Sequence, residues 1–174
     1  MYTHYLTGLP NAGGYMKYVG ELYEAGRIKE FSAFYINIKR FGLIARRFGM
    51  EESDRIICRY AGSLSDFIEE DECIGHLGGD NFTALIKKDR TEAFLDHIAE
   101  ISTYGQLRDR ENRIKLNSVA GVWEIDDHIT DPGQIIGFPA VAIGVAKNVT
   151  HAPYMYVTPQ MITQIDRQKM IEED

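Results

Sequence analysis

The sequence predicts an α+β domain in which helices cover a mostly antiparallel sheet. Three observations predict this class. Short apolar segments typical of strands alternate with helical patterns, a glycine-rich turn joins two of the strands directly, and no repeat, low-complexity tract or linker interrupts the 174 residues. This length suits one domain with one substantial core. We therefore expect a single domain over residues 1–174.

The first third of the chain predicts helices around one buried strand. Asn11 can cap a helix whose apolar residues recur at helical spacing, and Gly26 can end it. Residues 31–39 are rich in aromatic and branched side chains, as in a buried strand. A short helix over residues 41–48 and a long helix over residues 54–68 follow.

The run from Ile74 to Phe82 predicts a hairpin. A strand leads into the tight turn Gly78-Gly79, Asp80 lies at its tip, and a second strand runs from Phe82 to Ile86. The order of strand, helix, hairpin, helix and strand indicates a ferredoxin-like centre.

The remaining segments predict further helices and strands. In chain order, we expect a helix over residues 91–104, a long strand over 114–125, a helical region from Asp131-Pro132 to about Lys147 with a break near Pro139, a short edge strand over 154–157, and a last helix over about 158–174 that Thr158 and Pro159 begin. This last helix either frays into solvent or leads into a downstream domain.

Composition excludes several classes of partner. The formal net charge of -7 opposes binding to duplex nucleic acid, so only a local basic pocket could hold an anion. The longest apolar run, residues 135–146, is shorter than the ~20 residues that cross a bilayer. Cys58 and Cys73 lie in apolar patterns and are interpreted as reduced core residues. We expect a cytoplasmic domain without membrane contact of its own, although a parent protein could be membrane-anchored.

Five landmarks in order resemble the GGDEF family of bacterial diguanylate cyclases, which join two GTP molecules into cyclic di-GMP. They are Leu6-Thr7-Gly8-Leu9-Pro10-Asn11 before the first helix, Phe41 after an apolar strand, Asp54 at the opening of a long helix, Gly78-Gly79-Asp80-Asn81-Phe82 on the hairpin, and Ala146-Lys147 near the end. The resemblance spans nearly the whole chain. It implies a nucleotide-cyclase palm as the fold.

The resemblance also implies a metal site, and this chain departs from its pattern. Asn37 stands where the family has its first metal carboxylate, and Ile38 can offer a backbone carbonyl. Asp80 keeps the acid of the turn, whereas Asn81 replaces the glutamate that completes the family signature. Magnesium prefers hard, charged oxygen ligands. We therefore expect a vestigial turn with absent or very slow turnover, and Mg²⁺ or Mn²⁺ bound weakly, only together with a nucleotide.

Five positions match the family's nucleotide contacts. They are Phe41, Ala45, Asp54, Lys147 and His151. Asp54 could accept hydrogen bonds from a guanine edge or could simply complement a helix N-terminus, and Ala45 offers no hydrogen bond where the family has asparagine. Lys147 matches a phosphate-contacting lysine. His151 replaces an arginine and is equally an ordinary surface histidine.

The resemblance supports one function above two alternatives. A catalytically degenerate GGDEF domain would act as a regulatory, nucleotide-sensing or interaction module in cyclic di-GMP signalling, bind GTP or another nucleotide, and adjoin an EAL-type phosphodiesterase domain. The first alternative is a weak metal-dependent diguanylate cyclase that uses Asp80 and Asn37. The second is a structural dimerisation module without a ligand. Because residues 69–72 are all acidic, we expect no cyclic di-GMP feedback at the position of the family's inhibitory site.

Overall fold

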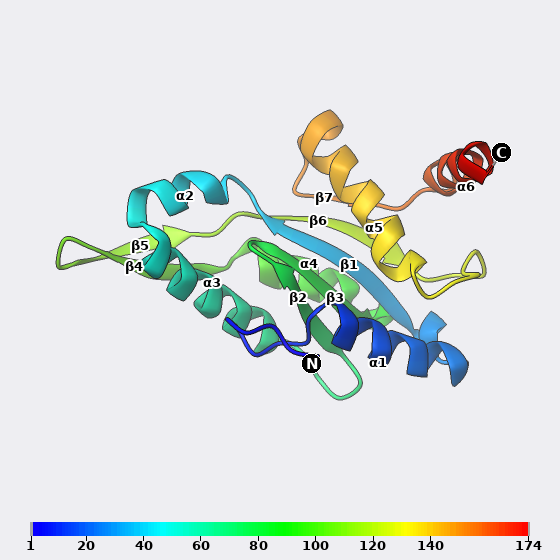
Figure 1. Cartoon of the computed structure of the whole chain (residues 1–174), viewed down its shortest axis with the longest axis horizontal. Helices are drawn as coiled ribbons and strands as arrows, with labels where there is room; N and C mark the ends of the chain where they lie inside the picture. Colours follow the sequence, from blue (N-terminus) through cyan, green and yellow to red (C-terminus); the bar gives the residue numbers. More distant parts are fainter. Residues whose placement is uncertain (1, 174) are drawn as a thin grey trace.

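A five-stranded sheet forms the centre of the computed structural model, which describes residues 2–173 (Figure 1). The strands lie in the order β2-β3-β1-β6-β7, and every neighbouring pair is antiparallel except β6 and β7. Their bounds are β1 (Phe31–Ile38), β2 (Cys73–Gly78), β3 (Asn81–Lys87), β6 (Ser118–Glu124) and β7 (Tyr154–Tyr156). The predicted α+β class with a mostly antiparallel sheet is confirmed. Met1 and Asp174, the two ends of the predicted domain, lie outside the described residues.

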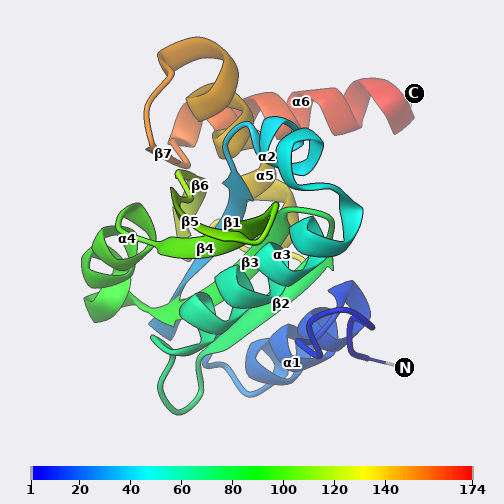
Figure 2. The ribbon, with the colours of Figure 1, turned by 90° about the vertical axis from the view of Figure 1, so that its left-hand side faces the viewer.

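Helices cover both faces of this sheet (Figures 1 and 2). They are α1 (Ala12–Glu24), α2 (Phe41–Phe48), α3 (Met50–Ser65), α4 (Thr91–Ala99), α5 (Gln134–Val145) and α6 (Pro159–Glu173). The core on one face contains buried side chains of α3 and α4, and the core on the other contains those of α1 and α5. No helix within residues 2–173 is long and apolar enough to cross a membrane.

The alternation of side chains along β1 decides what each face carries. Phe34, Ile36 and Ile38 belong to the core under α3 and α4, whereas Phe31 and Ala33 belong to the core under α1 and α5. Successive side chains of a strand point to opposite faces. The side chains at the odd-numbered positions of β1, from 31 to 37, therefore lie on the sheet face that α5 covers.

Two predicted caps are confirmed by hydrogen bonds. The Asn11 side chain accepts a bond from the backbone N–H of Gly14 at 3.0 Å and begins α1. Thr158 Oγ1 accepts one from the N–H of Met161 at 3.2 Å and begins α6. Each bond satisfies a helix N–H that has no partner within the helix.

A two-stranded hairpin, β4 (Ser102–Leu107) and β5 (Arg110–Lys115), corrects two of the expectations. The helix predicted over residues 91–104 ends at Ala99, and the strand predicted over 114–125 is divided between β5 and β6. The helical spacing continues to Ile101 although the burial pattern of β4 already alternates with period two. Arg108 and Asp109 have positive φ and close the hairpin, which projects from the sheet in Figure 1.

Glu52 fastens this hairpin to α3. Its buried carboxylate accepts hydrogen bonds from the N–H of Gln106 at 2.6 Å and from the guanidinium groups of Arg55 and Arg59. Burial alone would raise the pKa of Glu52, but these three donors lower it. The long helix starts at Met50 rather than at Asp54, so Glu52 lies in its first turn. The carboxylate both stabilises the helix start and holds the hairpin.

Close packing of α5 on β6 explains why Pro139 does not break the helix. The prediction of a break there is wrong, since α5 continues to Val145 with Phe138 and Pro139 buried. A Cβ on Gly121 of β6 would clash with the backbone oxygen of Pro139 and lie 2.6 Å from the backbone nitrogen of Ile143. Packing against the sheet offsets the hydrogen bond that the proline cannot donate.

His76 links the N-terminal segment to the glycine turn. Its Nε2 lies 2.8 Å from the carbonyl oxygen of Gly79, and its Nδ1 lies 3.0 Å from the Thr7 hydroxyl. Because the carbonyl oxygen of Gly79 can only accept a hydrogen bond, Nε2 of His76 carries the proton, and Nδ1 accepts a hydrogen bond from the Thr7 hydroxyl. The ring also stacks on Phe82 at 4.4 Å and lies 3.9 Å from the His4 ring. The neutral imidazole thereby stabilises the glycine turn through its hydrogen bond to Gly79.

We predict that Gly121→Ala destabilises the domain by about 3 kcal/mol or more, because the new methyl group would meet rigid helix backbone rather than a movable side chain. Gly144→Ala in α5 is the matched control. Its Cβ would meet nothing within 4 Å, and alanine favours a helix by roughly 0.5–1 kcal/mol. Urea unfolding of both variants measures the difference. Equal stability of the two variants would contradict the packing described for β6 and α5.

We predict that the stability of the domain falls as pH drops from about 7.5 to 5.5, partly through His76. Burial lowers the pKa of this imidazole below its ordinary 6.5; the bond to Gly79 opposes that shift and the neighbouring His4 adds to it. The unfolded chain therefore binds the proton first as pH falls, which favours unfolding. His76→Gln should reduce the slope of unfolding free energy against pH. An unchanged slope in His76→Gln would refute this account.

Candidate functional site

The turn between β2 and β3 depends on its two glycines. Gly78 has φ 133° and Gly79 has φ 53°, values that side chains with a Cβ rarely adopt. Gly78 pairs with Asn81 across the hairpin. This geometry leaves Asp80 at the tip, as the sequence predicts.

Strand register brings the end of β1 against this turn. Asn37 pairs directly with Asn81 of β3. The Asn37 amide nitrogen donates to Asp80 Oδ2 at 2.8 Å, to Asn81 Oδ1 at 3.1 Å and to the backbone oxygen of Asp80 at 3.3 Å. On its other side, Lys147 Nζ donates to Asn37 Oδ1 at 3.1 Å.

Only one orientation of the Asn37 amide satisfies all of these groups. Three oxygen acceptors surround its nitrogen, and an ammonium donor faces its oxygen. Turning the amide over would place oxygen against oxygen and N–H against ammonium. Asn37 therefore presents hydrogens, and no free oxygen, to the Asp80 carboxylate.

Lys147 reaches this position because α5 lies on the same sheet face as Asn37. The helix ends at Val145 and continues as one π-helical turn, Ala146–Thr150, whose first residue is buried. Lys147 follows that buried anchor. His151 comes next after the turn in the left-handed conformation, with φ 53°, and is exposed.

The field of the Asp80 carboxylate extends along β1. Tyr35 is two residues before Asn37 and so lies on the same face. Burial raises the pKa of Tyr35, and the negative charge of Asp80 raises it further. The charge of Asp80 thus reaches Tyr35 near the end of β1, and the Asp80 carboxylate is hydrogen-bonded to the Asn37 amide.

These residues do not fit a two-cation centre. Asp80 is the single carboxylate among the three positions that would hold metal, and Asn37 turns an N–H₂ group towards it. Ile38 has its side chain in the core under α3, so it could contribute only backbone. Within residues 2–173, no group of three or more histidine, cysteine or acidic side chains could hold a metal ion. The lysine ammonium also repels a cation.

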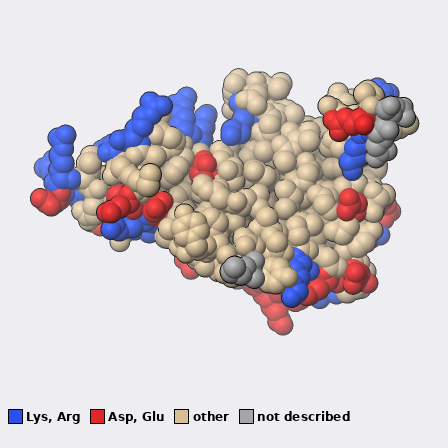
Figure 3. Space-filling view, in the orientation of Figure 1, with Lys and Arg blue, Asp and Glu red and all other residues tan. Residues whose placement is uncertain are grey.

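A basic cleft of about 820 Å³ opens beside Asn37 and Lys147. The end of β1, the start of α2, the junction of β5 and β6, and the π-helical turn line it. Its basic side chains are Lys39, Arg40, Lys115, Lys147 and His151, and Glu100 is the acid on its wall. Figure 3 shows lysine and arginine side chains gathered at the end of the molecule that carries α2 and the hairpin. This is the kind of local basic surface that an anion would need on an acidic protein.

The structure separates the other predicted nucleotide residues from this cleft. Phe41 packs against the core, Ala45 is half-buried on α2, and Asp54 is exposed on α3. None of the three lines the cleft. Asp54 lies beyond the first turn of α3, where Glu51 and Glu52 are found, so its interpretation as an acid complementing the helix start is wrong.

Sequence reasoning missed Lys39, Arg40 and Lys115. Lys39 and Arg40 follow the end of β1, and Lys115 is the last residue of β5. All three line the cleft. Basic residues clustered at strand ends were the available signal.

The acidic run over residues 69–72 has a structural role in part. The buried carboxylate of Glu72 accepts hydrogen bonds from the backbone N–H groups of Glu69 and Lys87 and from the Arg90 guanidinium.

Comparisons with known proteins agree with this geometry. The family model described as "Diguanylate cyclase, GGDEF domain" matches residues 2–148. Diguanylate cyclase DgcP of Escherichia coli (strain K12) is 32% identical over 86 residues, which are 48% of this chain and 25% of that protein. The chain thus matches about a quarter of the length of this curated relative.

Solved structures share the fold. The GGDEF domain of TpbB (YfiN) from Pseudomonas aeruginosa superimposes with a TM-score of 0.76 at 19% identity, covering 94% of this chain and 99% of that one. A microbial GGDEF domain described in a novel interaction mode with cyclic di-GMP gives a TM-score of 0.71 at 21% identity, covering 88% and 95%. The family match over most of the chain, together with the glycine turn and the palm-like sheet, establishes that this chain belongs to the GGDEF domain family of diguanylate cyclases.

Proposed function

We propose that this GGDEF domain is catalytically degenerate and acts as a regulatory, nucleotide-sensing module in cyclic di-GMP signalling. The observation that carries the proposal is the bonding of Asn37. Its amide nitrogen, 2.8 Å from Asp80 Oδ2, takes the place where cyclase chemistry needs a second anionic ligand. Divalent cations contribute several kcal/mol to phosphoryl-type transition states, so their loss removes turnover before it removes binding.

Three features support binding of a nucleotide such as GTP. The cleft has room for a ligand of that size, its basic side chains outnumber the single acid on its wall, and Lys147 is already held in place by Asn37. A bound nucleotide could alter a neighbouring domain through a coupling of roughly 1–3 kcal/mol. We propose an EAL-type phosphodiesterase domain as that neighbour, in a cytoplasmic setting.

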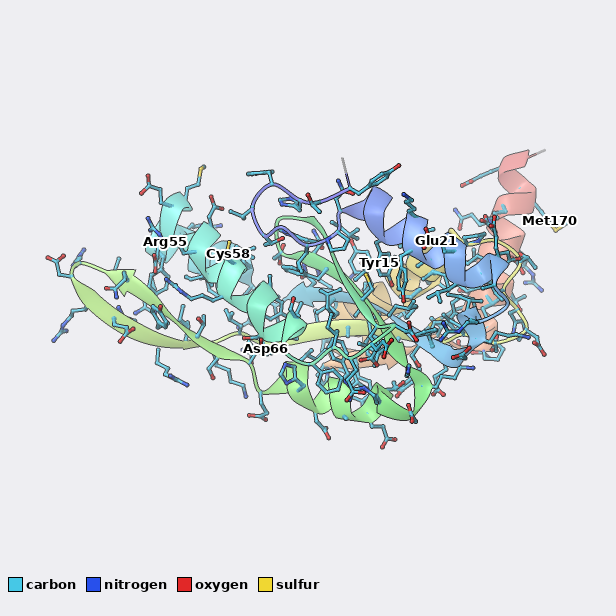
Figure 4. All side chains as sticks on the ribbon, turned by 90° about the horizontal axis from the view of Figure 1, so that it is seen from below. Tyr15, Glu21, Arg55, Cys58, Asp66 and Met170 are labelled. Carbon is cyan, nitrogen blue, oxygen red and sulfur yellow. The ribbon has the colours of Figure 1, made fainter. Side chains whose placement is uncertain are left out.

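An interaction role is a second candidate, and α6 favours it. Met170 and Ile171 are 68% and 76% exposed on this helix, and Met170 points away from the rest of the molecule in Figure 4. Tyr15, in contrast, is directed from α1 into the core in the same view. These exposed apolar side chains support a contact with another domain or a second copy.

We predict that the domain, incubated with GTP and either Mg²⁺ or Mn²⁺, accumulates no cyclic di-GMP above background. The double variant Asn37→Asp with Asn81→Glu supplies the missing carboxylates and should gain measurable Mn²⁺ binding. Chromatography of the nucleotides and calorimetry with the metal test the two expectations. Product formation by the unmodified domain that disappears in Asp80→Asn would instead establish a weak cyclase.

We predict that Ala45→Asn leaves the preference for GTP over ATP unchanged, because Ala45 lies on α2 outside the lining of the basic cleft. A new hydrogen bond to the base would contribute about 0.5–1.5 kcal/mol, or roughly 2-fold to 12-fold in affinity ratio. Calorimetric titrations with both nucleotides measure the ratio, and Ala93→Asn on the exposed face of α4 is the control. A ratio that rises in Ala45→Asn alone would show that the base lies against α2 and not in the cleft.

A further inference from the structure

We infer that the Lys147 ammonium, held by Asn37, replaces a divalent cation, so that the basic cleft binds the polyphosphate group of a nucleotide without metal. This inference rests on the proposed nucleotide-binding function and adds the way in which the ligand's charge is neutralised. It also specifies the ligand class as a nucleoside triphosphate or another compound with linked phosphates.

The first argument is the order of charges from the turn to the cleft. Asp80 is negative, the Asn37 amide bridges it to Lys147, and Lys147 is positive at the cleft wall. A metal bound between Asp80 and a phosphate would produce the same sequence of charges. Here the Asn37 amide and the Lys147 ammonium stand in the place of that metal. The amide is bonded to Asp80 at 2.8 Å, and the ammonium is bonded to the amide at 3.1 Å.

The second argument is the donor capacity that remains. An ammonium group has three donors, and Lys147 uses one on Asn37 among the described residues. Lys39, Arg40 and Lys115 line the same cleft and make no side-chain hydrogen bond or ion pair with residues 2–173. Several charged donors therefore face the cleft, ready for phosphate oxygens.

The third argument concerns what a divalent cation would meet. A cation there would face the charged side chains of the cleft, which are Lys39, Arg40, Lys115 and Lys147. The Asp80 carboxylate would be its anionic ligand, and Oδ2 of that group already accepts a hydrogen bond from Asn37. Magnesium dehydrates reluctantly and prefers anionic oxygens. Magnesium bound to the phosphates would instead cancel charge that the cleft needs. Magnesium should therefore leave affinity unchanged or weaken it.

Calorimetry on the whole chain tests the inference with two probes, GTP and inorganic tripolyphosphate, each in EDTA and in excess Mg²⁺. We expect both probes to bind in EDTA and to bind equally or less tightly in Mg²⁺. Tighter binding of GTP than of tripolyphosphate would identify a nucleotide as the ligand, whereas equal binding would identify the phosphates alone as what the cleft recognises. Either result supports the inference about charge.

Variants separate Lys147 from general electrostatics. Lys147→Met should weaken binding in EDTA by about tenfold or more, since a charged hydrogen bond contributes about 1.5–3 kcal/mol. Lys147→Arg should retain most of the affinity. Lys169→Met removes the same charge from exposed α6 and should have little effect. Asn37→Asp should make binding depend on Mg²⁺, because it restores an anionic oxygen beside Asp80.

Three outcomes would overturn the inference, and they differ in meaning. Binding that requires Mg²⁺, or that Lys147→Met leaves unchanged, refutes metal replacement while nucleotide sensing stands. No binding of either probe in either buffer refutes both proposals. Lys147 is exposed, so its variants should fold normally, which circular dichroism can check.

Discussion

The four hydrogen bonds of the Asn37 amide are the constraint on which the site depends. They join the end of β1, the glycine turn and the segment after α5, three parts of the chain that lie far apart in sequence. A side chain with two different ends, one donating and one accepting, can link an acid to an ammonium without bringing them into contact. Aspartate at this position would present oxygens on both sides and would repel Asp80. The amide thus forms a neutral bridge between Asp80 and Lys147.

Rigid packing around this bridge explains how such a contact is maintained. Gly121 lets the backbone of α5 approach β6 so closely that a methyl group would not fit, and the buried Ala146 fixes the start of the π-helical turn. From the other side, His76 bonds to the carbonyl of Gly79 and to Thr7. Both the turn and the segment that carries Lys147 are therefore positioned by a buried residue, His76 on one side and Ala146 on the other. The sheet and helices that support the site have the fold of the GGDEF family.

Local patterns predicted most elements and failed where tertiary packing competed with periodicity. Asn11, Thr158 and the glycine turn were assigned correctly because capping and positive φ are properties of short segments. The hairpin β4–β5 was missed since Ile101 continues a helical spacing, although contacts with Glu52 stabilise strands there. Pro139 was expected to break a helix, but burial against β6 outweighs one missing hydrogen bond. These errors share a cause, because each depends on a partner distant in sequence.

The sequence by itself determined which charges the site has, namely one acid at the turn and amides at Asn37 and Asn81. It also determined the turn, since Gly78 has a φ of 133°, a value that glycine adopts at little cost and that side chains with a Cβ rarely adopt. Tertiary structure alone decided that Asn37 donates to Asp80, that Lys147 meets its oxygen, and that Lys39, Arg40 and Lys115 share one cleft. Strand register and helix packing set these distances. Residue identity states what a group can bind, whereas the fold decides which groups are close enough to bind it.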